Sequence, residues 1–345
     1  MTTWSTPALL LLGIAAGPYG LNLLTSSVLL LLDPGIAMTV AMLGIFVGIS
    51  VNIRQRAVPR TLAASFVRTM TTVLGVGAVT LAISSWGLVQ VPVPAPLRGS
   101  DPRTLWLLAL MAGVCAAVSH AAEDVNVDDV LMIVAGGLIV AAIRAPTPDA
   151  MLLVALAVAG ISVMVALAGW LLVGQANSEG EQHVFVVGSL LLTGGAAAYL
   201  SVSAAFAGLI AGLTWNVAGN VAKARIVRDL NYFQHPLVVL VLITAGASAT
   251  LSVEAMWLGA IFVATRPSFK SLGVAMARRL HDVPTTAEGR SSLISAGLVG
   301  IALAFDAFRA NGRPEWAVTL LGGVVIGTIG SEVIALFLPP RETAR

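Results

Sequence analysis

The chain has 345 residues, of which 57% are hydrophobic and only 10% are charged, against roughly 25% charged residues in soluble domains. Its mean hydropathy is +0.93, and its formal net charge at pH 7 is only +2. This composition excludes a soluble protein, because the chain lacks the polar side chains needed to cover an apolar core in water. The scattered basic residues and the near-neutral charge also exclude nucleic acid as a partner.

Long uncharged stretches follow one another along the chain. The stretch 182–222 has 41 residues, and as a single helix it would measure about 60 Å, twice the ~30 Å of a hydrocarbon core. We therefore expect the chain to turn at Ser201-Val202-Ser203. The stretches without Asp, Glu, Lys or Arg include 34–53, 69–97, 104–122, 150–178, 182–222 and 230–253.

These runs predict an all-α polytopic membrane protein with about twelve transmembrane helices. The abundant glycine and alanine would let helix backbones pack closely in lipid. The predicted loops are too short to bury a core, so we expect 1–345 to form one transmembrane domain without a soluble domain. The expected helices cover residues 7–31, 35–53, 60–88, 104–122, 126–144, 149–174, 182–200, 202–219, 234–251, 254–272, 291–310 and 315–338.

Basic residues near the ends of these helices predict the orientation of the chain. With twelve helices, most of them fall on one side, together with both termini. Cytoplasmic loops carry the excess of Lys and Arg, so we expect this side and both termini to face the cytoplasm, in the inner membrane. The residues concerned are Arg54, Arg56, Arg60, Lys223, Arg225, Arg228, Lys270, Arg278, Arg279, Arg290, Arg341 and Arg345.

An acidic pair, Asp128-Asp129, opens the apolar run VLMIVAGGLIVAAI. A charge near the bilayer centre costs at least ~2.5–3.5 kcal/mol, so ionisable groups there are candidates for function. Two adjacent carboxylates repel each other when both are ionised. Such a pair can hold protons or a monovalent cation, but not both at full occupancy. The alternative is that Asp128, with Asp124 and Asn126, only caps a helix at the membrane surface.

Other polar residues offer fewer indications. His120 follows Ser119 at the end of an apolar run, where it either titrates near neutral pH or simply faces water. The Glu123–Asp129 stretch could serve a membrane-embedded enzyme, although motifs such as H-E-x-x-H, C-x-x-C and G-x-S-x-G are absent. We expect Asp306 and Glu332 to face neighbouring helices. Cys115 is the only cysteine, which excludes an intrachain disulfide. No metal site and no cofactor are predicted.

Several blocks occur in an order that resembles a known family. The first apolar run breaks at Gly17-Pro18-Tyr19-Gly20, and the next ends on Gly48-Ile49-Ser50-Val51-Asn52. The order resembles the transmembrane domain of the monovalent cation:proton antiporter superfamily, in its sodium/proton exchanger and potassium-efflux branch. Further matching residues are Glu181, Ser203, Ala205, Phe206, Ala207, Gly208, Gly212, Pro236 and Gly246.

The resemblance implies an inverted-repeat fold that exchanges Na⁺ or K⁺ for H⁺ by alternating access, as a homodimer in the lipid bilayer. It implies that Asp128 and Asp129 bind the ion and the proton, and that Arg266 forms an ion pair with Asp128. The implied lining of the site is Ser119, His120 and Asn126. The interval from Ser119 to Asp128 is much shorter than in the family. A second hypothesis is therefore a non-transporting or regulatory relative that has lost ion coupling.

Overall fold

The computed structural model describes residues 6–51, 58–86, 102–118, 127–145, 147–218, 220–281, 297–310 and 314–336, and the regular elements in these ranges are all helices. They are α1 (Thr6–Ala16), α2 (Ser26–Leu31), α3 (Asp33–Ser50), α4 (Val58–Trp86), α6 (Pro102–Ala117), α7 (Val127–Arg144), α8 (Pro148–Gln175), α9 (Glu179–Tyr199), α10 (Ala204–Ala218), α11 (Asn220–Ser248), α12 (Val253–His281), α14 (Leu298–Arg309) and α15 (Glu315–Leu336).

Several segments are long and apolar enough to cross a membrane, which confirms the prediction of an all-helical, multi-pass membrane protein. They are Ser26–Ser50, Ala63–Ser84, Pro148–Gln175, Lys223–Ser248 and Glu315–Ala335. The twelve spans remain a prediction.

The chain turns at both places where the sequence is broken. The turn at Ser201 is confirmed, because α9 ends at Tyr199 and Ser201 takes a left-handed backbone conformation with φ 52°. The backbone N–H of Val202 donates to the carbonyl of Ala197 and so satisfies the helix end. The segment 7–31, expected as one helix, instead forms α1 and α2, separated by a turn that begins at Gly17 and includes Asn22 with φ 52°.

Two helices extend well beyond their predicted bounds. α11 begins at Asn220 instead of residue 234, and α12 continues to His281 instead of residue 272. The added residues include Lys and Arg, which are good helix formers, so the helices continue past the apolar runs. Lys223, Arg225 and Arg228 therefore lie on α11, and Arg278 and Arg279 lie on α12.

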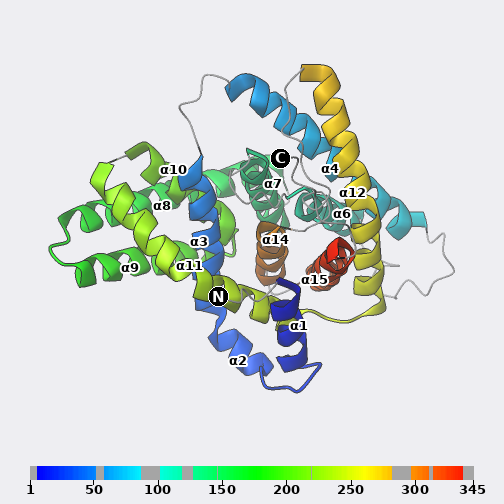
Figure 1. Ribbon diagram of the computed structural model, residues 1–345, viewed down its shortest axis with the longest axis horizontal. Coiled ribbons are helices and arrows are strands. Elements are labelled where there is room, and N and C mark those ends of the chain that lie inside the picture. Colours follow the sequence, from blue (N-terminus) through cyan, green and yellow to red (C-terminus); the bar gives the residue numbers. More distant parts are fainter. Residues whose placement is uncertain are drawn as a thin grey trace, which may run out of the picture.

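The helices form two bundles (Figure 1). In the first, the α10 bundle, α10 packs against α3, α8 and α9, while α11 packs against α1 and α3. In the second, the α12 bundle, α12 packs against α4 and α15, and α6 contacts α4, α7 and α14. α7 and α14 lie centrally and contact helices of the α10 bundle, as Figure 1 shows.

Glycines determine how closely α3 and α10 approach. Gly44 and Gly48 on α3 face Gly208 and Gly212 on α10, each pair spaced by four residues. A Cβ atom at any of the four would collide with the backbone of the opposite helix. Small residues at this spacing allow close helix packing in lipid, where apolar burial alone does not drive helices together.

We expect Gly208→Ala to destabilise the protein by about 1–3 kcal/mol, because the added methyl group has no room against Ala41. The matched control is Gly160→Ala on α8, where no atom lies within 4 Å of the added Cβ. Its effect should be neutral or slightly stabilising, since alanine favours the helix. Thermal unfolding in detergent micelles measures the stability of both variants. Equal unfolding midpoints would contradict the close packing of α3 against α10.

Two short helices meet inside the α12 bundle. α6 has 16 residues and α14 has 12, which correspond to about 24 and 18 Å, less than the ~30 Å of a hydrocarbon core. A Cβ at Gly300, in the first turn of α14, would lie 2.8 Å from the carbonyl oxygen of Cys115 near the end of α6. The end of one short helix therefore packs against the start of the other, within the protein.

Candidate functional site

The acidic pair lies inside the protein, in the first turn of α7. Asp128 is 1% exposed and Asp129 is 8% exposed. Both carboxylates are therefore enclosed by helices, whereas a cap at the membrane surface would remain open to water. The N-terminal end of a helix also favours negative charge, because its first backbone N–H groups point toward such side chains.

Arg68 of α4 is the partner of Asp128. Its Nη2 donates to Oδ2 of Asp128 in a close ion pair. The other carboxylate oxygen, Oδ1, has no hydrogen-bond partner among the described residues. The sequence analysis did not single out Arg68. The sequence could have indicated Arg68, because it is the only charged residue between positions 61 and 97.

Arg266 is fully buried at the middle of α12. Its Nε donates to the carbonyl oxygen of Ala116, and its Nη2 to that of Val118, both at 2.9 Å. The guanidinium also lies 5.8 Å from the ring centroid of Phe262, in the range of a cation–π contact. Arg266 therefore closes the end of α6, where the last carbonyls lack helical partners and the helix dipole favours a cation.

This arrangement differs from the ion pair between Arg266 and Asp128 that the resemblance implied. The structure pairs Asp128 with Arg68, while Arg266 donates to the buried carbonyls of Ala116 and Val118 at the end of α6. The physical reason is the end of α6 inside the protein. Its orphan carbonyls need a donor, and a helix end of this kind is not visible in an uninterrupted apolar sequence.

Two buried basic residues, Arg266 and Lys270, lie one turn apart on α12. Lys270, one turn beyond Arg266, is 1% exposed. One turn further, a Cβ at Gly273 would lie 2.6 Å from the backbone oxygen of Arg68. The segment from Arg266 to Gly273 therefore runs for about 10 Å from the end of α6 to the level of Arg68. Glu332 of α15 acts electrostatically on Arg266. We call Arg68, Asp128, Asp129, Arg266 and Lys270 the charged layer.

The remaining predicted lining residues cannot be compared with the structure. Ser119, His120 and Asn126 lie outside the described residues, as do Glu123 and Asp124.

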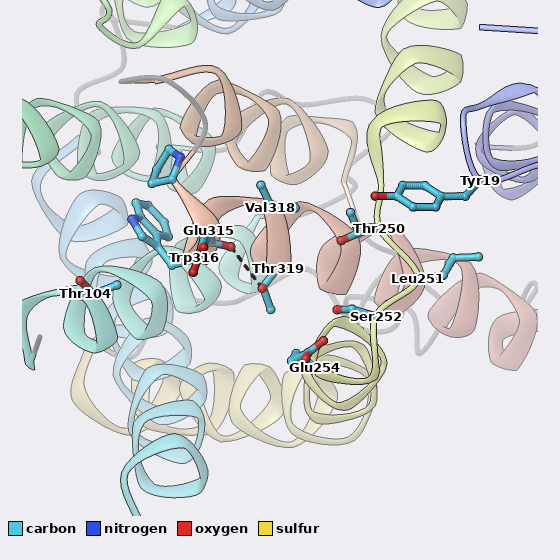
Figure 2. Close-up of a pocket in the computed structure, with 11 residues that line it drawn as sticks. Tyr19, Thr104, Thr250, Leu251, Ser252, Glu254, Glu315, Trp316, Val318 and Thr319 are labelled. Carbon is cyan, nitrogen blue, oxygen red and sulfur yellow. Dashed lines mark hydrogen bonds between the residues drawn. The ribbon is translucent and has the colours of Figure 1, made fainter. Parts of the chain in front are cut away.

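A pocket of about 700 Å³ lies away from this layer, at the starts of α12 and α15. Figure 2 shows Glu254, at the start of α12, and Glu315, at the start of α15, together with Trp316 and, across the pocket, Tyr19. Thr319 donates to the backbone oxygen of Glu315 at 3.2 Å. No lining residue comes from α7, so this pocket does not reach the acidic pair.

Comparison with known proteins identifies the fold. No protein-family model and no curated protein matches the chain. Among solved structures, the chain is similar to a sodium/proton antiporter from Methanocaldococcus jannaschii, with a TM-score of 0.58 and 15% sequence identity. The similarity covers 96% of this chain and 89% of the antiporter. Over this part of its length, the chain therefore has the fold of that antiporter.

Proposed function

We propose that this protein is a secondary transporter that exchanges a monovalent cation, Na⁺ or K⁺, for H⁺ by alternating access. The observation that carries the proposal is the buried acidic pair, Asp128 and Asp129, in the first turn of α7, with Asp128 in an ion pair with Arg68. Discontinuous helices are a recurrent feature of ion sites in transporters. The antiporter fold supports the same activity.

In the proposed mechanism, the two aspartates have different roles. Arg68 pairs with Asp128 and keeps it ionised, because a guanidinium stays protonated. Asp129 then binds either a proton or a cation as the site alternates between the two sides of the membrane. Since neither Arg68 nor Arg266 can release a proton, these residues support one-for-one exchange. Arg266 would stabilise the end of α6 beside the passing ion.

An inverted repeat would account for the order of helices in the α12 bundle. α4 and α12 each have 29 residues. Among the described helices, each is followed by a short helix, α6 or α14, and then by a longer one, α7 or α15. We propose that these two series are related by a two-fold axis in the membrane plane, with Asp129 in one repeat and Arg266 in the other. Alternating access commonly depends on such repeats.

The direct test is an exchange assay in proteoliposomes with a pH-sensitive dye. In liposomes with an acidic interior, we expect Na⁺ or K⁺ added outside to release protons, and a scan over Li⁺, Na⁺ and K⁺ identifies the cation. Liposomes with the Asp128→Asn/Asp129→Asn variant serve as the control. Absence of exchange with all three cations would contradict the proposal and favour a non-transporting relative.

Cysteine labelling tests the orientation. Leu251, between α11 and α12, is 50% exposed, and Arg279, near the other end of α12, is also exposed. With both termini in the cytoplasm, Leu251→Cys should react with an impermeant maleimide outside intact cells. Arg279→Cys should react only after permeabilisation, because basic residues mark the cytoplasmic side. Native Cys115 is buried and should not interfere. The opposite labelling pattern would reverse the orientation.

A further inference from the structure

A buried carboxylate joins the two bundles at one end of α14. Asp306, which is 3% exposed, accepts hydrogen bonds from Ser203 Oγ at 2.5 Å and from the backbone N–H groups of Ala204 and Ala205 at 3.1 and 3.2 Å. Ser203 in turn accepts from the N–H of Phe206. Asp306 of the α12 bundle therefore caps the N-terminus of α10, where a negative charge is favoured.

An ion pair lies one turn further along α14. Arg309 donates through Nε to Oδ1 of Asp33 at 2.7 Å and through Nη2 to Oδ2 at 2.8 Å. A third bond, of 3.2 Å, runs from Nη2 to the backbone oxygen of Asp33. The Arg309 side chain is only 8% exposed. A bidentate pair of this kind is stronger than most and requires a fixed orientation of both groups.

Both contacts connect α14 with the helices α3 and α10 of the α10 bundle. Asp306 and Arg309 are three positions apart on α14, so they lie on the same side of that helix. Their partners, Asp33 at the start of α3 and Ser203 before α10, belong to the closely packed α3–α10 pair. Neither residue of α14 is in the charged layer, and Asp33 and Ser203 lie outside the α12 bundle. All four side chains meet where α3 and α10 begin and α14 ends.

We infer that Asp33, Ser203, Asp306 and Arg309 form a latch that holds the two bundles together at this end of the molecule. They are positioning residues that act through α14. With the latch formed, this end is closed, and breaking it favours the state that is open there. The inference rests on the proposed alternating access, because only relative motion of the bundles gives the latch a role in transport.

Distances between spin labels at both ends of the molecule test the latch. One label pair, at Tyr199 of α9 and Glu315 of α15, spans the latch end. A second pair, at Tyr232 of α11 and Arg279 of α12, spans the opposite end, and all four positions are exposed. In Asp33→Arg, we expect the ratio between molecules closed at the latch end and molecules open there to change by about tenfold or more. The reason is that the variant loses hydrogen bonds between charged groups. The first distance should lengthen and the second should shorten.

The charge-swapped variant Asp33→Arg/Arg309→Asp should restore the original distances. Glu179→Gln, which breaks an exposed ion pair with Arg228 within the α10 bundle, should change neither distance. Unchanged distances in Asp33→Arg, lengthening at both ends, or no recovery in the swapped variant would overturn the latch. The distances are measured without any transport. Absence of exchange would therefore contradict the proposed function, whereas the distances would still show whether the latch holds the two bundles together.

Discussion

Replacing Asp129 with asparagine should abolish cation/proton exchange and leave the protein folded. Asparagine keeps the size of the side chain, but it can neither take up a proton nor offer a negative charge to a cation. In the proposed mechanism Asp128 remains paired with Arg68 and cannot replace Asp129. The dye assay in proteoliposomes should therefore show exchange no faster than in liposomes without protein, whereas the unfolding temperature in detergent should stay close to that of the wild type.

Asp149 provides the matched control for this variant. It also lies in the first turn of a long helix, α8, but its side chain is exposed. Asp149→Asn should exchange ions at the wild-type rate. Wild-type exchange in Asp129→Asn would show that the acidic pair has only a structural role. The site of ion coupling would then have to lie elsewhere in the chain.

Replacing Arg68 with glutamine should cost about 3–5 kcal/mol of stability, because it leaves the carboxylate of Asp128 buried without its partner. Exchange should also fall, because the variant loses the ion pair that distinguishes Asp128 from Asp129 in the proposed mechanism. The double variant Arg68→Gln/Asp128→Asn removes both charges and should recover most of the lost stability. A double-mutant cycle in detergent, followed by thermal or denaturant unfolding, measures the coupling between the two residues.

The exposed pair of Arg228 and Glu179 is the control for this cycle. Its atoms are 3.4 Å apart, and the side chains are 56% and 78% exposed. Exposed ion pairs contribute little, so Glu179→Gln should leave the unfolding midpoint almost unchanged. If Arg68→Gln has an equally small effect, or if the double variant is no more stable than Arg68→Gln, the buried ion pair does not stabilise the α12 bundle.

The location of the candidate site could be predicted from the sequence more reliably than its contacts. Asp128 and Asp129 stand out because charges are rare in such a chain, and the structure encloses both. Arg266 is also buried, in keeping with a cation inside the protein. Its contacts with Ala116 and Val118, however, depend on α6 ending inside the bundle. Lys270 was expected near a helix end on the basic side of the membrane, yet it is buried within α12.

The sequence by itself determined that the protein is helical and crosses the membrane, and where the chain turns near Ser201. These properties follow from local composition, since every backbone polar group in lipid must be satisfied within a helix. Only the tertiary structure decided which helices meet, and hence the pairing of Arg68 with Asp128 and of Arg309 with Asp33. When a helix is apolar on every side, its sequence does not show which face is buried. In lipid, both the buried and the exposed faces are apolar, so helix rotation and depth are set by packing between distant segments.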